Sequence, residues 1–115
     1  MGNIIRKVQR DTLVYWAPKG TSSHGEPTWH APEQMTARWD DKRVEIIDDT
    51  GTTVFSRVEL ITEVLLEPGG VVCKGTLDTV SYWNEPKANP YAYEVLKSSS
   101  TPDFKARRLL YEAWA

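Results

Sequence analysis

The clearest pattern of hydrophobic and polar positions lies in residues 36–60, where two alternating runs flank a short polar turn. Downstream of the turn, Val54, Ser56, Val58 and Leu60 alternate with Phe55, Arg57, Glu59 and Ile61. Successive side chains of a strand point to opposite faces, so this run predicts a strand with one largely apolar face and one mixed face. The turn, Asp-Asp-Thr-Gly at residues 48–51, separates β-branched runs and predicts a β-hairpin.

Upstream of the turn the alternation continues, with a step at residues 41–43. Shorter apolar runs elsewhere follow the same two-residue period, which indicates strands that bury one face. Together these runs predict a core of mostly buried side chains: Leu13, Tyr15, Ala37, Trp39, Val44, Ile46, Val54, Val58, Leu60, Val72 and Val95.

The remaining chain divides into short strands between segments rich in glycine and proline. Strands are predicted for residues 12–16, 62–66, 71–75 and 91–98, with a turn at 67–70 that suggests a second hairpin and another turn at 101–103. Residues 105–114 combine helix formers with a strand-like alternation, so a short terminal helix and a strand both fit. Residues 17–32 and 84–90 contain prolines and are predicted as loops.

These patterns predict an all-β protein: a small β-barrel or sandwich of short antiparallel strands, with long loops and a projecting central hairpin. At 115 residues the chain fits one domain. Residues 1–10, which include three basic side chains, are expected to form an N-terminal arm.

Composition narrows the range of functions. The formal net charge is −2 and the pI is about 5.7, which gives no global reason to bind nucleic acid. Cys73 is the only cysteine, so no internal disulfide is expected and a reducing compartment is indicated. No stretch approaches the roughly 20 apolar residues that span a bilayer, so we expect a soluble protein made in the cytoplasm.

No group of side chains has the spacing of a catalytic or metal site. His24 and His30 suit no standard zinc pattern. The acidic residues of the central hairpin follow no calcium-loop spacing, and turn aspartates already have a conformational role. Cys73 follows two valines, which favours a small buried hydrophobe over a nucleophile. We therefore expect no enzyme activity, no metal and no cofactor.

Aromatic residues are more numerous than so small a core can hold, with five tryptophans and five tyrosines. Such side chains are enriched at protein interfaces, which indicates an assembly subunit. The simpler alternative is that two or three of them are core residues and the rest are half-exposed.

The order of several short motifs resembles a known family. The motifs are Tyr15-Trp16-x-Pro18-x-Gly20, Gly25-x-Pro27-Thr28-Trp29-x-x-Pro32, Ala37-Arg38-Trp39-x-Asp41, Asp48-Asp49-x-Gly51, Ser56-Arg57, Glu67-Pro68-Gly69-Gly70 and Pro102-Asp103-x-Lys105-Ala106. Their order and spacing, from about residue 12 to the apolar tail, are similar to those of the head-closure proteins of long-tailed bacteriophages and related tailed particles, also called stoppers or head-tail connectors. The basic residues 1–10 and Gly70 depart from that pattern.

The resemblance implies a structural virion protein without catalysis. Such a protein forms a six- or twelve-fold homo-oligomeric ring in the neck, between portal and adaptor proteins on one side and tail terminator or tail proteins on the other. It closes the head after packaging, and the DNA leaves through its lumen without sequence-specific binding. The chain would be made in the cytoplasm of a bacterial host, and no membrane would be involved.

Within that picture two sets of residues are assigned. In such stoppers the insertion after the early barrel strands projects inward, so the resemblance places Asp48, Asp49, Thr50 and Gly51 at the channel, where carboxylates repel passing DNA. A ring also requires two different contact faces on each subunit. The candidate interface residues are Trp16, Trp29, Trp83, Tyr111 and Trp114.

Two alternatives stay open. Another neck or tail-completion protein, such as an adaptor or tail terminator, is the nearer one, because fold alone does not separate these roles. The other is a small β-barrel module that binds nucleic acid or peptides, which would need an exposed platform of Trp16, Trp39 and Tyr93 ringed by Lys and Arg. The acidic neighbours Asp40 and Asp41 argue against such a platform.

Overall fold

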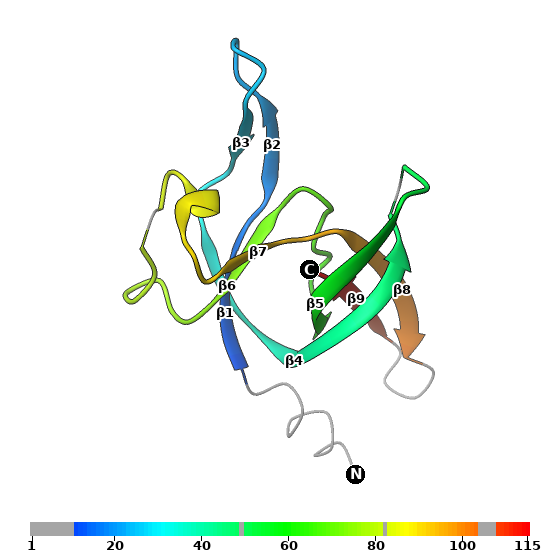
Figure 1. Ribbon diagram of the computed structural model, residues 1–115. Coiled ribbons are helices and arrows are strands. Elements are labelled where there is room, and N and C mark those ends of the chain that lie inside the picture. Colours follow the sequence, from blue (N-terminus) through cyan, green and yellow to red (C-terminus); the bar gives the residue numbers. More distant parts are fainter. Residues whose placement is uncertain (1–10, 49, 82, 104–107) are drawn as a thin grey trace.

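The computed structural model describes residues 11–48, 50–81, 83–103 and 108–115, and in these the fold is all-β, as predicted (Figure 1). The elements are β1 (Asp11–Trp16), β2 (Pro18–Thr21), β3 (Pro27–Trp29), β4 (Glu33–Ile47), β5 (Thr53–Thr62), β6 (Val71–Lys74), the 3₁₀-helix η1 (Pro86–Ala88), β7 (Ala92–Glu94), β8 (Lys97–Asp103) and β9 (Arg108–Trp114). The N-terminal arm expected at residues 1–10 lies outside the described residues.

Seven of the described strands form one antiparallel sheet in the order β7-β6-β1-β4-β5-β9-β8. The order runs from one edge to the other without closing, so the architecture is sandwich-like and not a closed barrel. The remaining strands, β2 and β3, pair with each other. They form a small hairpin inside residues 17–32, a segment that the prolines alone predict as a loop.

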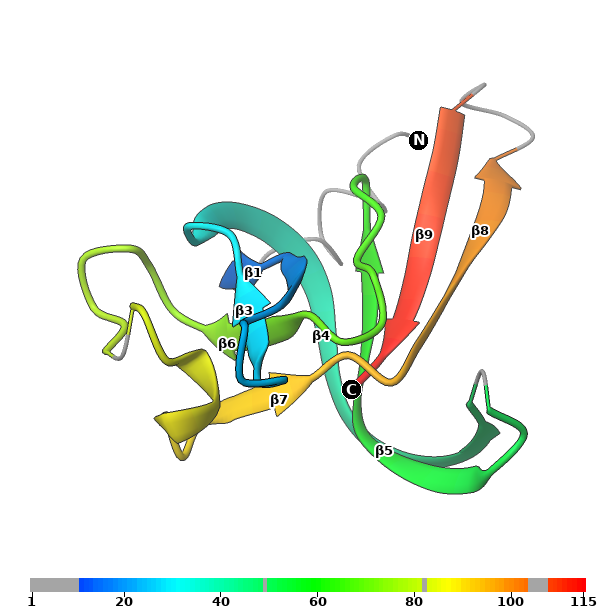
Figure 2. The same cartoon turned by 90° about the horizontal axis from the view of Figure 1, so that it is seen from above.

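The long strand β4 joins the two halves of the sheet. Its first half pairs with β1 up to Ala37, and its second half pairs with β5 from Arg38 onward. Its curved course carries the chain from the β7-β6-β1 half to the β5-β9-β8 half (Figure 2). The apolar faces of both halves can therefore contribute to one core.

The main core contains side chains from both halves of the sheet. Leu13 of β1, Leu60 of β5, Val72 of β6 and Ala113 of β9 belong to one buried cluster. Eight of the eleven predicted core residues are buried, namely Leu13, Tyr15, Ala37, Trp39, Val58, Leu60, Val72 and Val95. The other three, Val44, Ile46 and Val54, are only half-buried, because they lie where the β4–β5 hairpin extends beyond the neighbouring strands.

A second, smaller cluster covers the opposite face of β1. Val14 and Trp16 pack there with Val71 and Cys73, and Trp29 of β3 packs against them. Both faces of β1 are thus buried, which explains why its sequence is a nearly continuous apolar run. Cys73 is a buried thiol, as predicted.

Several elements differ from the sequence-based expectations or decide between them. The strand predicted at 62–66 is wrong beyond Thr62, where β5 ends, and the strand predicted at 91–98 is divided between β7 and β8. Residues 108–114, where a short helix and a strand both fit the sequence, form a strand, because β9 lies between β5 and β8 and hydrogen-bonds to both. The turn predicted at 101–103 lies within β8. The turn at 67–70 is present, with a hydrogen bond from the Gly70 amide to the Glu67 carbonyl. It does not join a hairpin, however, because β6 pairs with β1 and β7 and not with β5.

Packing explains the glycine at position 70. A Cβ atom there would lie 2.7 Å from Cε1 of Tyr15 and 2.9 Å from the carbonyl oxygen of Trp16. Real Cβ atoms do not approach backbone oxygens so closely, so any larger residue would displace the β1 backbone or the core tyrosine.

Candidate functional site

The projecting part of the β4–β5 hairpin is the first candidate site, and we call it the hairpin arm (residues 41–47 and 53–57). In the described chain the β1 partner of β4 ends at Ala37 and the β9 partner of β5 ends at Glu59. Among the described residues, only the base of the arm has a further strand-edge contact, where the Arg57 amide donates to the Ala115 carbonyl. Beyond that point the two strands have open edges and project from the body of the sheet (Figures 1 and 2).

Apolar side chains lie on both faces of the hairpin arm. Val44, Ile46 and Val54 are half-buried on the face that continues the core. On the other face, Ile47 is 57% exposed and Phe55 is 51% exposed. A two-stranded hairpin is at best marginally stable alone in water, and grouped exposed hydrophobic residues mark interaction sites. The hairpin arm therefore has the properties of a docking element.

A β-bulge at the base of the arm brings three basic side chains together. The register shifts after Asp41, so that Lys42 and Arg43 both lie opposite Arg57. All three cations are exposed, and within the described chain they form no ion pair. The Arg43 guanidinium lies 4.1 Å from the centre of the Phe55 ring, a cation–π contact that holds it over an exposed aromatic.

The turn at the tip of the arm is organised by Asp48. Its Oδ1 accepts hydrogen bonds from the amide and hydroxyl of Thr50, at 3.0 and 2.6 Å, and from the amide of Thr52 at 3.0 Å. These bonds, with the Thr50 hydroxyl as the largest cause, lower the pKa of Asp48. Gly51 has a φ of 84°, which favours glycine. Three of the four predicted channel residues thus form one turn, while Asp49 lies outside the described residues.

The predicted interface residues differ widely in exposure. Trp16 is completely buried, and its Nε1 donates to the Trp83 carbonyl oxygen at 2.9 Å. It has no side-chain surface left for a neighbouring subunit, so its assignment to the interface is corrected. The indole of Trp83 is 49% exposed. Trp29, Tyr111 and Trp114 are half-buried.

The exposed platform required by a nucleic-acid or peptide module is absent at the residues proposed for it. Trp16 and Trp39 are buried, and Tyr93 packs against the main core. The Trp39 and Tyr93 rings meet edge to face with their centres 5.9 Å apart. These aromatic residues stabilise the two cores, because Trp16 of β1, Trp39 of β4 and Tyr93 of β7 all pack inward.

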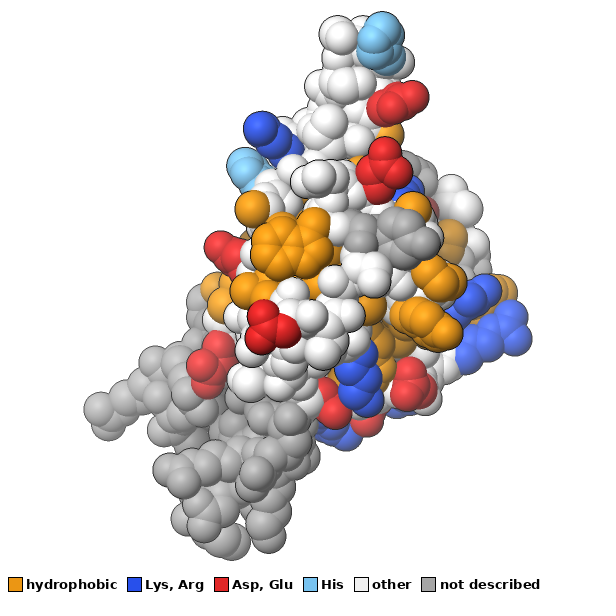
Figure 3. All heavy atoms as spheres, turned by 90° about the vertical axis from the view of Figure 1, so that its left-hand side faces the viewer, with side chains coloured by type: hydrophobic (Ala, Val, Ile, Leu, Met, Phe, Trp, Pro, Cys, Tyr) orange, Lys and Arg blue, Asp and Glu red, His pale blue; other side chains and the backbone are white. Residues whose placement is uncertain are grey.

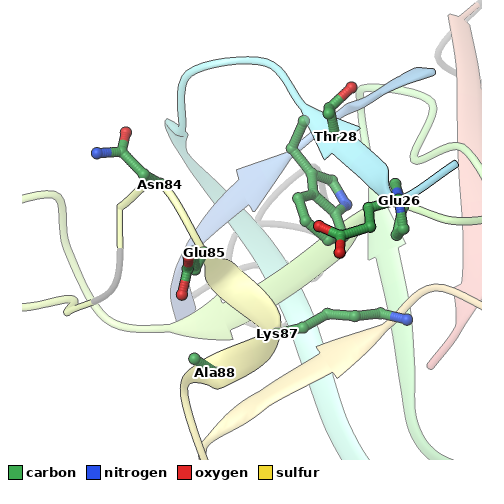
Figure 4. A pocket seen from close by; sticks show the side chains of 8 residues that line it. Glu26, Thr28, Asn84, Glu85, Lys87 and Ala88 are labelled. Carbon is green, nitrogen blue, oxygen red and sulfur yellow. The ribbon is translucent and has the colours of Figure 1, made fainter. Parts of the chain in front are cut away.

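A hollow of about 550 Å³ lies between the β2–β3 hairpin and η1. Figure 4 shows its two walls, with Glu26 and Thr28 on one side and Asn84, Glu85, Lys87 and Ala88 on the other. Pro27 and Trp29 complete its lining, and we call it the acidic hollow. Figure 3 shows the side of the molecule on which η1 lies, where acidic and exposed hydrophobic side chains are interspersed.

Charge in the acidic hollow is predominantly negative. The Lys87 ammonium pairs with Glu94 outside the lining, at 2.5 Å, so its charge is already compensated. Glu26 and Glu85 are exposed and, in the described part of the chain, belong to no ion pair. The hollow thus offers two uncompensated carboxylates beside the half-buried indole of Trp29.

The structure brings together groups that the sequence pattern does not connect. The basic bulge has a local signal, since Lys42 and Arg43 interrupt the alternation of β4 with two consecutive cations. The acidic hollow has none, because Glu26 and Glu85 are far apart in sequence and line one hollow only in the folded chain (Figure 4).

The described residues give no support for a metal site. No three His, Cys, Asp or Glu side chains there are grouped so that they could hold a metal ion. His24 and His30 are exposed.

None of the helical segments described has the length and hydrophobicity needed to cross a membrane. No family model, curated protein or solved structure matches the chain.

Proposed function

We propose that this protein is a structural subunit of the neck of a tailed phage particle, where its copies form a ring between the portal-adaptor complex and the tail. The ring would close the head after DNA packaging and release the DNA at ejection. The order of turn and aromatic motifs that resembles head-closure proteins supports this role. Catalysis has no part in it.

The observation that carries the proposal is the hairpin arm. Its open strand edges and its two apolar faces are stabilised when another protein surface covers them. In a ring each subunit contacts the next one head to tail, which supplies such a surface to every arm. The exposed indole of Trp83, on another part of the molecule, is available for a second contact.

We place the tip of the hairpin arm at the lumen of the ring, with Asp48, Thr50 and Gly51 and, from its position in the sequence, Asp49. Carboxylates repeated by the ring symmetry repel phosphates over a Debye length of about 8 Å at physiological salt. A narrow acidic passage would let DNA move without gripping it, whereas a basic one would add salt-dependent contacts.

The direct test is to locate the chain in a cryo-electron microscopy map of the particle whose genome encodes it. The proposal expects a ring of six or twelve copies between the portal-adaptor complex and the tail. Density at the adaptor or tail-terminator position would instead favour the nearest alternative role. Absence of the chain from purified particles would overturn the proposal.

The channel assignment has a separate test in two phage variants. Asp48→Lys is expected to slow DNA exit, because a ring of cations binds phosphates. Removal of residues 49–52 is expected to give heads that leak DNA. Asp78→Lys, which changes an exposed acid outside the arm, serves as the control. Normal DNA retention and normal ejection in both arm variants would rule out a luminal gate.

A further inference from the structure

We infer that the base of the hairpin arm docks in the acidic hollow of a second copy of this chain, so that subunits associate head to tail. This inference rests on the proposed ring and identifies the two surfaces that join its subunits. Four features carry it: the charges of the two surfaces, their exposed hydrophobic residues, their positions on the molecule and the open edges of the arm.

The charges of the two surfaces are complementary. Arg38 and Lys74 have carboxylate partners within the chain. Lys42, Arg43 and Arg57 have none among the described residues, and they differ from an isolated unpaired cation such as Lys19 because the bulge groups three of them. The acidic hollow presents the opposite arrangement, with two uncompensated carboxylates and one cation that is already paired. Opposite potentials of this kind align partners and fix their register.

Exposed hydrophobic residues accompany the charges on both surfaces. The arm carries Ile47 and Phe55, each more than half exposed. The acidic hollow is lined by Trp29, and exposed Trp83 precedes its Asn84 wall in the chain. Nucleic acid would neutralise the bulge cations but would leave Ile47 in water. A second copy of this chain supplies both the carboxylates and the aromatic surface.

The two surfaces lie on different parts of the molecule, and the hairpin arm extends away from the acidic hollow. In both ribbon views η1, which forms one wall of the acidic hollow, lies on one side and the tip of the hairpin arm on the other (Figures 1 and 2). Two different, complementary surfaces on separate parts of one subunit produce a heterologous contact, which repeats from copy to copy and closes into a ring when the rotation allows. Two like surfaces would produce only a dimer.

A charge-exchange experiment tests the contact in solution. Self-association of the purified chain is measured by sedimentation velocity at several protein and salt concentrations. Arg43→Glu with Arg57→Glu, and separately Glu26→Lys with Glu85→Lys, are each expected to weaken association by at least about tenfold, because like charges then face each other. All four substitutions in one chain are expected to restore association. Added salt is expected to weaken it in the wild type.

Controls separate this effect from misfolding and from a general charge effect. Lys19→Glu reverses an exposed cation of β2 that has no ion pair among the described residues, and it should leave association unchanged. Circular dichroism melting curves of every variant should match the wild type. Unchanged association in both reversed pairs, or no recovery in the fourfold variant, would overturn the inference.

Cross-linking shows directly which surfaces meet. Cys73 is buried, so a short bis-maleimide should react with cysteines introduced by Arg43→Cys and Glu85→Cys. The double variant is expected to give a ladder of multimers. Dimers formed as efficiently by either single variant would indicate that like surfaces meet and would overturn the inference.

The outcome is distinguishable from that of the proposed function. The docking inference is overturned if the wild-type chain stays monomeric at every concentration. It is also overturned if the bulge cations bind a labelled DNA duplex and their substitution leaves self-association unchanged. The position of the chain in the particle map decides the neck role independently. A ring in the neck whose subunits join through other surfaces would leave the proposed function standing.

Discussion

At the scale of single residues, burial separates side chains that stabilise the fold from those available to a partner. Leu13 is completely buried in the main core, whereas Leu65 is 45% exposed. Leu13→Ala is expected to lower the free energy of unfolding by about 2–5 kcal/mol, because the change removes buried methyl groups and leaves a cavity. Leu65→Ala is expected to change it by less than about 0.5 kcal/mol.

Urea unfolding of the two variants measures this difference. Equal losses of stability for Leu13→Ala and Leu65→Ala would show that β1 does not face the core in the assigned phase.

Tyr15 is expected to make the stability of the fold depend on pH in the alkaline range. Its buried hydroxyl oxygen accepts a hydrogen bond from the Glu67 amide at 2.8 Å, and burial is the main cause that raises its pKa. The unfolded chain releases this proton near pH 10, before the folded chain does. The contribution of Tyr15 to the free energy of unfolding is therefore fully present below about pH 10. It is lost as the pH rises from there through the higher pKa of the folded state.

Urea unfolding between about pH 8 and about pH 11 checks this expectation. The wild type should lose stability with pH more steeply than Tyr15→Phe, which has no ionisable group at this position. A common slope for both proteins would show that the Tyr15 hydroxyl keeps an ordinary pKa in the fold.

At the scale of elements, the turn of the hairpin arm depends on one carboxylate. Asp48→Ala removes the acceptor of three hydrogen bonds, so the amides of Thr50 and Thr52 should exchange their hydrogens faster. Asp48→Asn retains an acceptor oxygen and should preserve most of the protection. Because hydrogen bonding lowers the pKa of Asp48, its stabilising contribution is present above about pH 4 and is lost as the pH falls further.

Amide exchange followed by nuclear magnetic resonance measures both effects. The acid-induced loss of protection should occur in the wild type and not in Asp48→Asn. Unchanged exchange rates in Asp48→Ala would mean that backbone hydrogen bonds alone hold the turn.

Elements that the sequence predicts well are those whose signals are local. The β4–β5 hairpin has alternating residues and a turn within one stretch, so its existence and phase are predictable. Residues 108–114 are different, because their helix formers and their alternation conflict locally. The conflict is resolved by pairing with β5 and β8, and β5 is remote in sequence. The pairing of β6 with β1 likewise follows from the core and not from the adjacent turn.

At the scale of the whole molecule, Trp83 offers the cleanest test of an aromatic contact between subunits. Trp29 and Trp114 donate hydrogen bonds to Gly69 and Glu59 within the chain, so truncating them disturbs the fold as well. The Trp83 side chain is half-exposed, and its backbone oxygen, which survives substitution, is the acceptor for Trp16.

Trp83→Ala should therefore keep the thermal midpoint near that of the wild type while weakening self-association by about 2 kcal/mol or more, the usual effect of a central interface tryptophan. Val64→Ala, at an exposed position outside both proposed surfaces, is the control. Sedimentation velocity and melting curves measure the two quantities. Unchanged association in Trp83→Ala would remove this residue from the interface.

The candidate site is less predictable from sequence than the fold. The excess of aromatic residues indicates an assembly subunit. It does not show that Trp16 is buried in the smaller core cluster while Trp83 remains exposed. That distinction depends on β1 being covered on both faces. The face that carries Trp16 is covered by β3 and residues 77–80, which come from distant parts of the chain. Charge complementarity between the arm and the hollow also requires their three-dimensional positions.

The place of β9 in the sheet also determines when the sheet can be completed while the chain is being synthesised. β9 pairs with β5, although the ribosome makes β9 after every other strand described here. Until β9 emerges, β5 retains a free hydrogen-bonding edge beside a hydrophobic face, which is the kind of surface that recruits strands from other chains. Nascent chains on neighbouring ribosomes of one messenger are therefore the most exposed to such pairing, and slower translation of the codons for β9 should increase the amount of insoluble protein.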